Sequence, residues 1–285
     1  MADFKVRRMI FKPKTWSTIA RYLVLVIFGI LFIAPVFWMI SSSLKADYEI
    51  FSFPIKWWPK EPRWQNYPEA LSQLPFGRFA INTLIIALRT IIGHLLSCSI
   101  VAYGFSRFKA PGSGFFFLVL LSTLMLPYPV IMVPLYIIFS RLGWINSFLP
   151  LIVPAFFGNA FYIFLLRQSF KQIPADLEDA AVMDGATTLQ TLWYIILPLA
   201  RPALATVAIF TFQAAWNDFL GPLIFLHDQT KYTLMQGLSF FRGSYTVNWA
   251  YLMAASLVVS LPVVLIYVIA QRQFVQGIAF SGRKG

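Results

Sequence analysis

Long apolar stretches, separated by shorter polar connections, run through most of this chain. A helix needs about 20 mainly apolar residues to cross the hydrocarbon core of a bilayer, and about six segments meet that requirement. They cover roughly residues 23–43, 79–103, 115–139, 149–166, 202–225 and 249–269. The pattern predicts an all-α integral membrane protein with one transmembrane domain over residues 1–285, and bends in the third span at Pro127, Pro129 and Pro134.

The polar connections set the orientation of these spans. Six basic residues lie before the first span, between Lys5 and Arg21, and with six spans the side that holds both termini and the connection 171–198 carries 14 Lys and Arg against 8 on the other side. Basic residues favour the cytoplasmic side, so both termini and the connection 171–198 are expected there. The long connections 44–78 and 226–248 are then external.

Composition excludes a soluble protein of this length. The chain of 285 residues is 59% hydrophobic and only 12% charged, which is about half the charged fraction of a soluble domain. The net charge of +12 could indicate a nucleic-acid partner. With this hydropathy we assign the basic residues to cytoplasmic loops instead, expect contact with membrane lipid, and expect no nucleic acid.

Catalytic and cofactor-binding patterns are absent from the sequence. It has no G-x-x-x-x-G-K-[ST] loop, so ATP binding by a P-loop is excluded. The residues that most often bind metals or act as nucleophiles are scarce, with only His94, His227 and Cys98. We therefore expect no metal site, no bound cofactor and no enzyme activity in this chain.

The connection 171–198 has the signals of a short helix followed by a second one. Pro174 suits a helix start, and three acidic residues follow within one turn, where negative charge favours the helix dipole. Ala180 and Ala181 make part of one face small, so another protein could approach closely. The alternative is an amphipathic linker that rests on the membrane surface.

Residues after this first helix predict a tight turn. Gly185 is placed to end the helix in the left-handed conformation. Thr187 and Gln190 form the T-x-x-Q pattern of a capping box for a second helix, which is predicted to run to about Leu197 and to end at Pro198.

Several polar side chains fall inside the predicted spans. A charge at membrane depth should face protein or water, so Arg89 either lines a pathway or pairs within the protein, for instance with Asp218. Amides with an aromatic ring suit a sugar, although amides also bond between helices, and His94 fits that structural role. The candidate pathway residues are Arg89, Asn159, Gln213, Trp216 and Asn217.

The chain resembles a known family at several separated motifs. Asp179-Ala-Ala-Val-Met-Asp-Gly185 is similar to the E-A-A-x-x-x-G signature of binding-protein-dependent ABC importer permeases, with Asp179 in place of the usual glutamate. Asn82-Thr-Leu84, Ala102-Tyr-Gly-Phe-Ser-Arg107 and Trp216-Asn-Asp-Phe219 resemble the MalG-like branch, which serves carbohydrate importers. The resemblance covers about residues 23–285.

This resemblance implies a subunit that receives a sugar or oligosaccharide and passes it inward by alternating access. It implies a second, non-identical permease, a dimeric ATPase subunit that holds ATP and Mg, and an extracytoplasmic solute-binding protein. The residues expected to couple to the ATPase are Glu178, Asp179, Ala180, Ala181, Asp184 and Gly185. Those expected to contact the binding protein are Gln236, Phe240, Phe241, Arg242 and Tyr245.

Two alternatives stay open. An ion-gradient-driven secondary transporter would place ionisable groups deep in the membrane, and Asp218 is the only acid in a predicted span. An importer of the same class could instead carry a glycerol-phosphate-type substrate, because Arg89 suits an anion. The expected location is the cytoplasmic (inner) membrane, with several passes.

Overall fold

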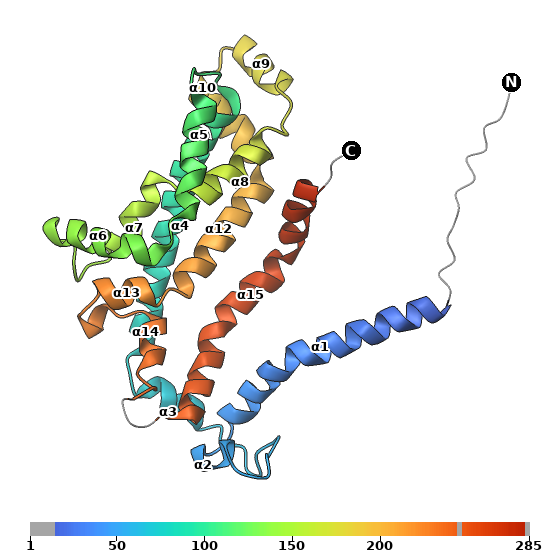
Figure 1. Ribbon diagram of the computed structural model, residues 1–285, viewed down its shortest axis with the longest axis vertical. Coiled ribbons are helices and arrows are strands. Elements are labelled where there is room, and N and C mark those ends of the chain that lie inside the picture. Colours follow the sequence, from blue (N-terminus) through green and yellow to red (C-terminus); the bar gives the residue numbers. More distant parts are fainter. Residues whose placement is uncertain (1–14, 244–246, 283–285) are drawn as a thin grey trace.

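A computed structural model describes residues 15–243 and 247–282, and over these ranges the chain is helical with no strand (Figure 1). The first half contains α1 (Thr15–Ser43), α2 (Asp47–Ile50), α3 (Asn66–Ser72), α4 (Phe76–Arg107), α5 (Ser113–Ser122), η1 (Thr123–Met125) and α6 (Tyr128–Arg141). The middle contains α7 (Leu149–Ile152), η2 (Val153–Phe157), α8 (Ala160–Phe170), α9 (Asp176–Met183), α10 (Thr188–Thr191), η3 (Leu192–Ile196) and α11 (Leu197–Leu199). The rest contains α12 (Arg201–Trp216), α13 (Leu220–Phe225), η4 (Gln229–Lys231), α14 (Leu234–Ser239) and α15 (Trp249–Gly282).

The described residues contain four helical segments long and apolar enough to cross a membrane, and up to six if each of two bent pairs counts as one span. The expected all-α membrane fold is thus confirmed. The predicted cytoplasmic termini lie in part outside the described residues.

The third span is more strongly broken than the sequence predicted. Helix α6 leaves the end of α5 and η1 at an angle of 98°. Pro127 precedes α6 and lacks a backbone N–H, and a residue before proline avoids helical angles. Leu126 accordingly adopts φ −82° and ψ 112°, so the chain turns between two helices.

The fourth and fifth spans also differ from single helices. Residues 149–170 are divided by the 3-10 segment η2 and by Gly158, whose φ of 97° stops helical propagation. The predicted fifth span, 202–225, ends early, because α12 stops at Trp216 and α13 begins only at Leu220.

Helix α4 lies at the centre of the fold and takes part in both hydrophobic cores. Near one end, Cys98 and Ala102 pack in a cluster with Leu166 of α8 and Val207 of α12. Near the other end, Phe76 and Phe79 join a second cluster, which includes Phe212, Trp216, Phe241 and Ala255.

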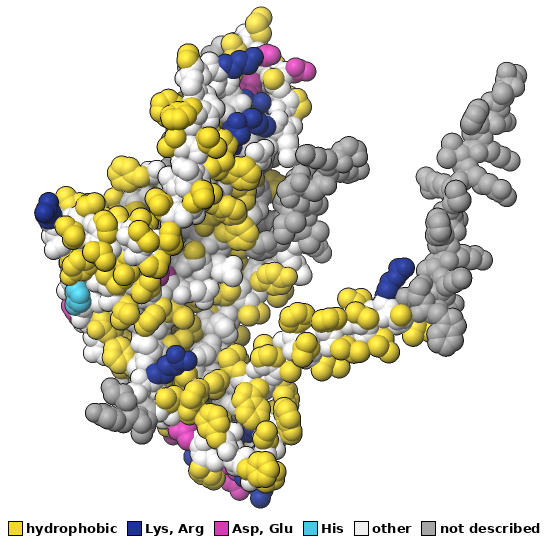
Figure 2. Space-filling model, viewed as in Figure 1, with side chains coloured by type: hydrophobic (Ala, Val, Ile, Leu, Met, Phe, Trp, Pro, Cys, Tyr) yellow, Lys and Arg dark blue, Asp and Glu magenta, His cyan; other side chains and the backbone are white. Residues whose placement is uncertain are grey.

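Helix α9 lies at the opposite end of the molecule from α2 and α3 (Figure 1). On the face drawn in Figure 2, acidic and basic side chains gather near these two ends, while hydrophobic side chains coat α1 and the flank between. Helix α1 contacts α15 and then stands away from the body, and its most apolar window has no buried residue. Apart from its buried end at Ser41, Ser42 and Ser43, this membrane-spanning helix is therefore largely uncovered by the rest of the chain.

Candidate functional site: the coupling hairpin and its supports

The coupling hairpin, defined here as residues 176–191, forms as its local signals predicted. Helix α9 has Asp176, Glu178 and Asp179 in its first turn. It ends in a Schellman motif, in which Ala186 N–H donates to Ala181 O at 2.9 Å and Gly185 N–H donates to Val182 O at 3.0 Å. The φ of Gly185 is 82°, which confirms the predicted left-handed turn.

The capping box that opens α10 is also confirmed. Thr187 Oγ1 accepts from Gln190 N–H at 3.4 Å, and Gln190 Oε1 accepts from Thr187 N–H at 2.8 Å. The second helix continues through η3, a π-helical segment, and through α11 to Leu199, one residue past the predicted end at Pro198. Pro198 lies near the end of this continuous helix, directly after the π-helical segment, and the bend of 81° follows before α12.

The outward surface of α9 differs from the expected small-residue face. Ala180 is exposed, but Ala181 is only 7% exposed and points into the chain. The large exposed apolar side chains of α9 are Leu177, Val182 and Met183, at 43%, 62% and 86%. Asp179, Asp184 and Gly185 are exposed as well.

Glu178 lies inside the chain and takes part in a polar cluster. Its carboxylate pairs with the Arg107 guanidinium, and Tyr103 Oη donates to Glu178 Oε2 at 3.0 Å. Arg107 also donates through Nη2 to Ile173 O, at 2.8 Å. The end of α4 thereby holds both the first turn of α9 and the segment that leads into it.

A second arginine supports the same region. Arg167 Nε donates to Phe105 O at 3.1 Å, and its guanidinium lies 3.9 Å from the centre of the Phe117 ring. This contact links the end of α8 to α4 and α5, directly before the coupling hairpin.

Two of the predicted pathway residues have structural partners. Trp216 is 5% exposed, and its Nε1 donates to Val259 O of α15 at 3.0 Å. Asn159 caps α8, because its Oδ1 accepts from Phe161 N–H at 3.0 Å.

The other three predicted pathway residues are exposed. Gln213 lines a mostly apolar hollow of about 240 Å³ between α12 and α15, and Asn217 donates to the Gln213 carbonyl oxygen at 2.9 Å. Arg89 is exposed on α4 and belongs to neither of the two ion pairs found among the described residues. Its suggested partner Asp218 instead accepts from Gly221 N–H, at 3.1 Å.

His94 has the structural partners expected of an interhelical hydrogen bonder. Its Nδ1 lies 3.3 Å from Thr211 Oγ1 of α12, and its ring meets Tyr162 of α8 edge-on.

The segment 226–248, which the sequence predicts to be external, is partly folded onto the chain. Gln236 is buried and caps α14 by accepting from Thr233 N–H at 3.1 Å, and Phe241 is buried and stacks on Phe76. These two side chains therefore face the protein interior, whereas Phe240 and Arg242 are exposed. Tyr245 lies outside the described residues.

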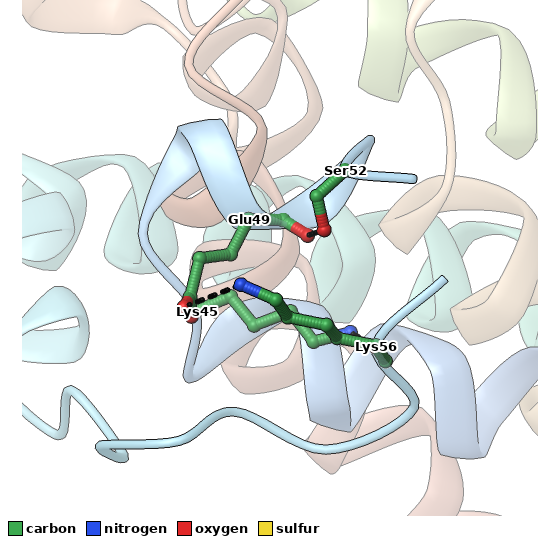
Figure 3. Close-up of polar contacts among 4 residues, drawn as sticks. All are labelled: Lys45, Glu49, Ser52 and Lys56. Carbon is green, nitrogen blue, oxygen red and sulfur yellow. Dashed lines mark hydrogen bonds and ion pairs between the residues drawn. The ribbon is translucent and has the colours of Figure 1, made fainter. Parts of the chain in front are cut away.

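The connection 44–78, which is also predicted to be external, contains a polar cluster that the sequence did not reveal. Lys45 is fully buried, donates through Nζ to Lys56 O at 2.5 Å, and lies 4.3 Å from the centre of the Trp38 ring. Lys56 Nζ meets Glu49 Oε1 at 3.2 Å (Figure 3). Burial lowers the pKa of Lys45, and the Glu49 carboxylate opposes that shift.

Metal ligands do not gather anywhere in the described part of the chain. No group of three or more His, Cys, Asp or Glu residues there could hold a metal ion. The polar contacts described above position helices against one another.

Comparisons with known proteins agree with this architecture. The diacetylchitobiose uptake system permease protein NgcG of Streptomyces coelicolor is 33% identical over 252 residues, which are 87% of this chain and 83% of that protein. The galactooligosaccharides transport system permease protein GanQ of Bacillus subtilis is 30% identical over 291 residues and is covered completely, as is this chain.

A solved structure has the same fold. A chain of a bacterial ABC transporter involved in import of the acidic polysaccharide alginate aligns with a TM-score of 0.79 and 24% identity, over 90% of this chain and 95% of that one. Residues 95–280 match the sequence pattern of a protein family, the binding-protein-dependent transport system inner membrane components. This chain therefore belongs to the family of binding-protein-dependent transport system inner membrane components.

Proposed function

We propose that the chain is one of two non-identical permease subunits of an ATP-driven importer for an oligosaccharide. The coupling hairpin carries this proposal, because it presents Asp179, Val182 and Met183 outward at the end that the basic residues assign to the cytoplasm. The oligosaccharide is suggested by the named substrates of the relatives NgcG and GanQ. The ATPase subunits, with their ATP and Mg, and the external binding protein are separate chains.

The exposed surface of α1 is an observation in favour of a second permease subunit. A span with an uncovered surface can lie in lipid, but a helix that stands away from its own bundle is also free to pack on another membrane protein. Close packing between helices supplies much of the attraction within a bilayer.

The test is a reconstituted complex of this chain, the second permease, the ATPase and the binding protein in vesicles. ATP hydrolysis and uptake are measured with a panel of di- and oligosaccharides. We expect both to rise with one sugar in the panel, and only when the binding protein is present. Uptake that follows a proton or sodium gradient and ignores ATP would support the secondary-transporter alternative.

Arg89 favours one variant of this function, an importer of the same class for an anionic substrate such as a glycerol phosphate or an acidic saccharide. The exposed guanidinium lies in the middle part of α4, where a charge needs water, protein or an anion beside it. Under this variant, Arg89→Gln lowers uptake of the anion, whereas Arg89→Lys retains much of it. Equal effects of both substitutions on a neutral sugar would argue for a structural role.

A further inference from the structure

Helix α4 is an unbroken connection between the two polar ends of the molecule. It has 32 residues and contains no proline. At a rise of 1.5 Å per residue it is about 48 Å long, enough to reach from one membrane surface to the other. The other route from the coupling hairpin, into α12, passes through a π-helical segment and a bend of 81°.

The inner end of α4 is fixed to the coupling hairpin by a cluster of nearly buried groups. The Arg107 and Glu178 side chains are only 16% and 14% exposed, and Tyr103 is 6% exposed. A buried ion pair that also receives a hydroxyl hydrogen bond strongly resists separation, because separation leaves an unpaired buried charge. We define these three residues as the inner joint.

The outer end of α4 is fixed to the external segment 226–248. Asn82 Nδ2 donates to Thr230 O and to Tyr232 O at 3.0 and 2.9 Å, and Thr83 Oγ1 accepts from Leu234 N–H at 3.0 Å. Asn82 and Thr83 are both buried. Gly237 comes so close to α4 that a Cβ there would lie 2.7 Å from the Phe79 ring. Asn82, Thr83, Phe79 and Gly237 form the outer joint.

We propose that α4 transmits movement of the coupling hairpin to the external segment as one rigid element, and that Glu178, Arg107 and Tyr103 are positioning residues for this coupling. Glu178 then acts through α4, not by direct contact with the ATPase. This inference rests on the proposed function, because it assigns the ATPase to one end of α4 and the binding protein to the other.

The test uses the complete complex and the panel sugar that stimulates the wild-type ATPase most. Glu178→Gln keeps the size of the side chain and removes its charge. We expect basal ATPase and complex assembly to be retained, while stimulation by the binding protein falls about fivefold or more. Arg107→Gln should likewise retain basal ATPase and assembly but lower the stimulation by the binding protein. The double variant should be no worse than the more severe single one, because the two residues act as a unit.

Asp176→Asn is the matched control. It removes another carboxylate from the first turn of α9, but Asp176 is exposed. Its stimulation should stay close to wild type, so a loss seen only with Glu178→Gln does not come from the helix dipole. Tyr103→Phe keeps the ring packing and removes only the hydroxyl, and is the second probe if Glu178→Gln fails to assemble.

The outer joint provides an independent arm. Asn82→Leu should also lower stimulation while basal ATPase is retained. Unchanged stimulation in the Glu178 and Tyr103 variants would overturn the inference, and so would additive losses in the Glu178 and Arg107 double variant. A wild-type complex that no binding protein stimulates would instead refute the proposed function itself.

Discussion

Gly185 sets the turn between the two helices of the coupling hairpin, and its backbone angle restricts what can replace it. A non-glycine residue in the left-handed region costs about 1–2 kcal/mol. A Cβ at Gly185 would meet no atom of this chain within 4 Å, so the cost is confined to the backbone and to whatever docks there.

We therefore expect Gly185→Ala to retain part of the transport activity and Gly185→Arg to abolish it. Both variants should still be inserted in the membrane. Uptake and binding-protein-stimulated ATPase are measured in vesicles, and insertion is checked by immunoblot of the membrane fraction. Normal transport by Gly185→Arg would show that no partner approaches this turn.

Trp216 and Gln213 were both predicted to be pathway residues, but Trp216 is buried and Gln213 is exposed, so substitutions at the two positions should have different effects. Trp216→Phe removes the hydrogen bond to Val259 O and should destabilise the chain by about 1 kcal/mol, with the KM for uptake unchanged. Gln213→Ala should leave the melting temperature unchanged and raise that KM. A changed KM for Trp216→Phe alone would return Trp216 to the pathway.

Sequence reasoning succeeded where a residue's role depends on its neighbours in the chain. Gly185 and the Thr187–Gln190 capping box are local, so their pattern determines their geometry. The burial of Ala181 and the pairing of Glu178 with Arg107 depend on how α9 lies against α4. That placement is tertiary, and no spacing within residues 171–198 encodes it.

At the scale of elements, α9 presents a different docking surface from the one expected. Burial of a methionine side chain contributes about 1.5–3 kcal/mol, and 1.4 kcal/mol corresponds to tenfold in affinity. Met183→Glu should therefore weaken binding of the ATPase subunit about tenfold or more. Met183→Leu should bind nearly as wild type, and co-purification at a series of ATPase concentrations measures both. Equal binding by the two variants would exclude Met183 from the interface.

A test of whether the external segment 226–248 contacts the binding protein needs point substitutions and not a deletion. Gln236 and Phe241 support the fold, so removing residues 236–244 would disturb the chain itself. Phe240→Ala with Arg242→Glu changes only exposed side chains, and it should weaken stimulation of the ATPase by the binding protein while basal hydrolysis is retained. Stimulation equal to wild type would move the contact elsewhere.

The effect of a proline on a helix was the hardest feature to predict, because it depends on where in the helix the proline lies. Pro127 directly follows an extended residue and separates two helices at 98°, whereas Pro198 lies inside a helix that continues to Leu199. Both were read from the same rule, that proline lacks an N–H. At Pro198 the π-helical segment η3 comes directly before the proline, and the chain bends by 81° only after Leu199.

For the whole molecule, hydropathy was sufficient to predict the class and the approximate spans. Apolar length alone defines a crossing. The predicted ends of α1, α4 and α15 therefore agree with the structure to within a few residues, except at the start of α1 and the end of α15. The position of α1 was not predictable, since an apolar helix has the same sequence pattern whether it packs on its own chain, on lipid or on another subunit.

The exposed span α1 gives the last prediction, which concerns assembly. If α1 packs on the second permease, a cysteine at an exposed position such as Val26 should form a cross-link with that subunit in the intact complex. The native Cys98 is buried and provides a background with little reactivity. We expect Val26→Cys, labelled with a benzophenone maleimide and irradiated in the intact complex, to give an adduct that contains both permeases, because the photoactivated ketone inserts into a C–H bond of its neighbour, whereas unsubstituted chain gives none. Cysteine at Ala255, which is fully buried between helices of this chain, is the matched control and should give no adduct. Adducts between two copies of this chain would instead indicate a homodimer, and a complete lack of adducts with Val26→Cys would place α1 in lipid.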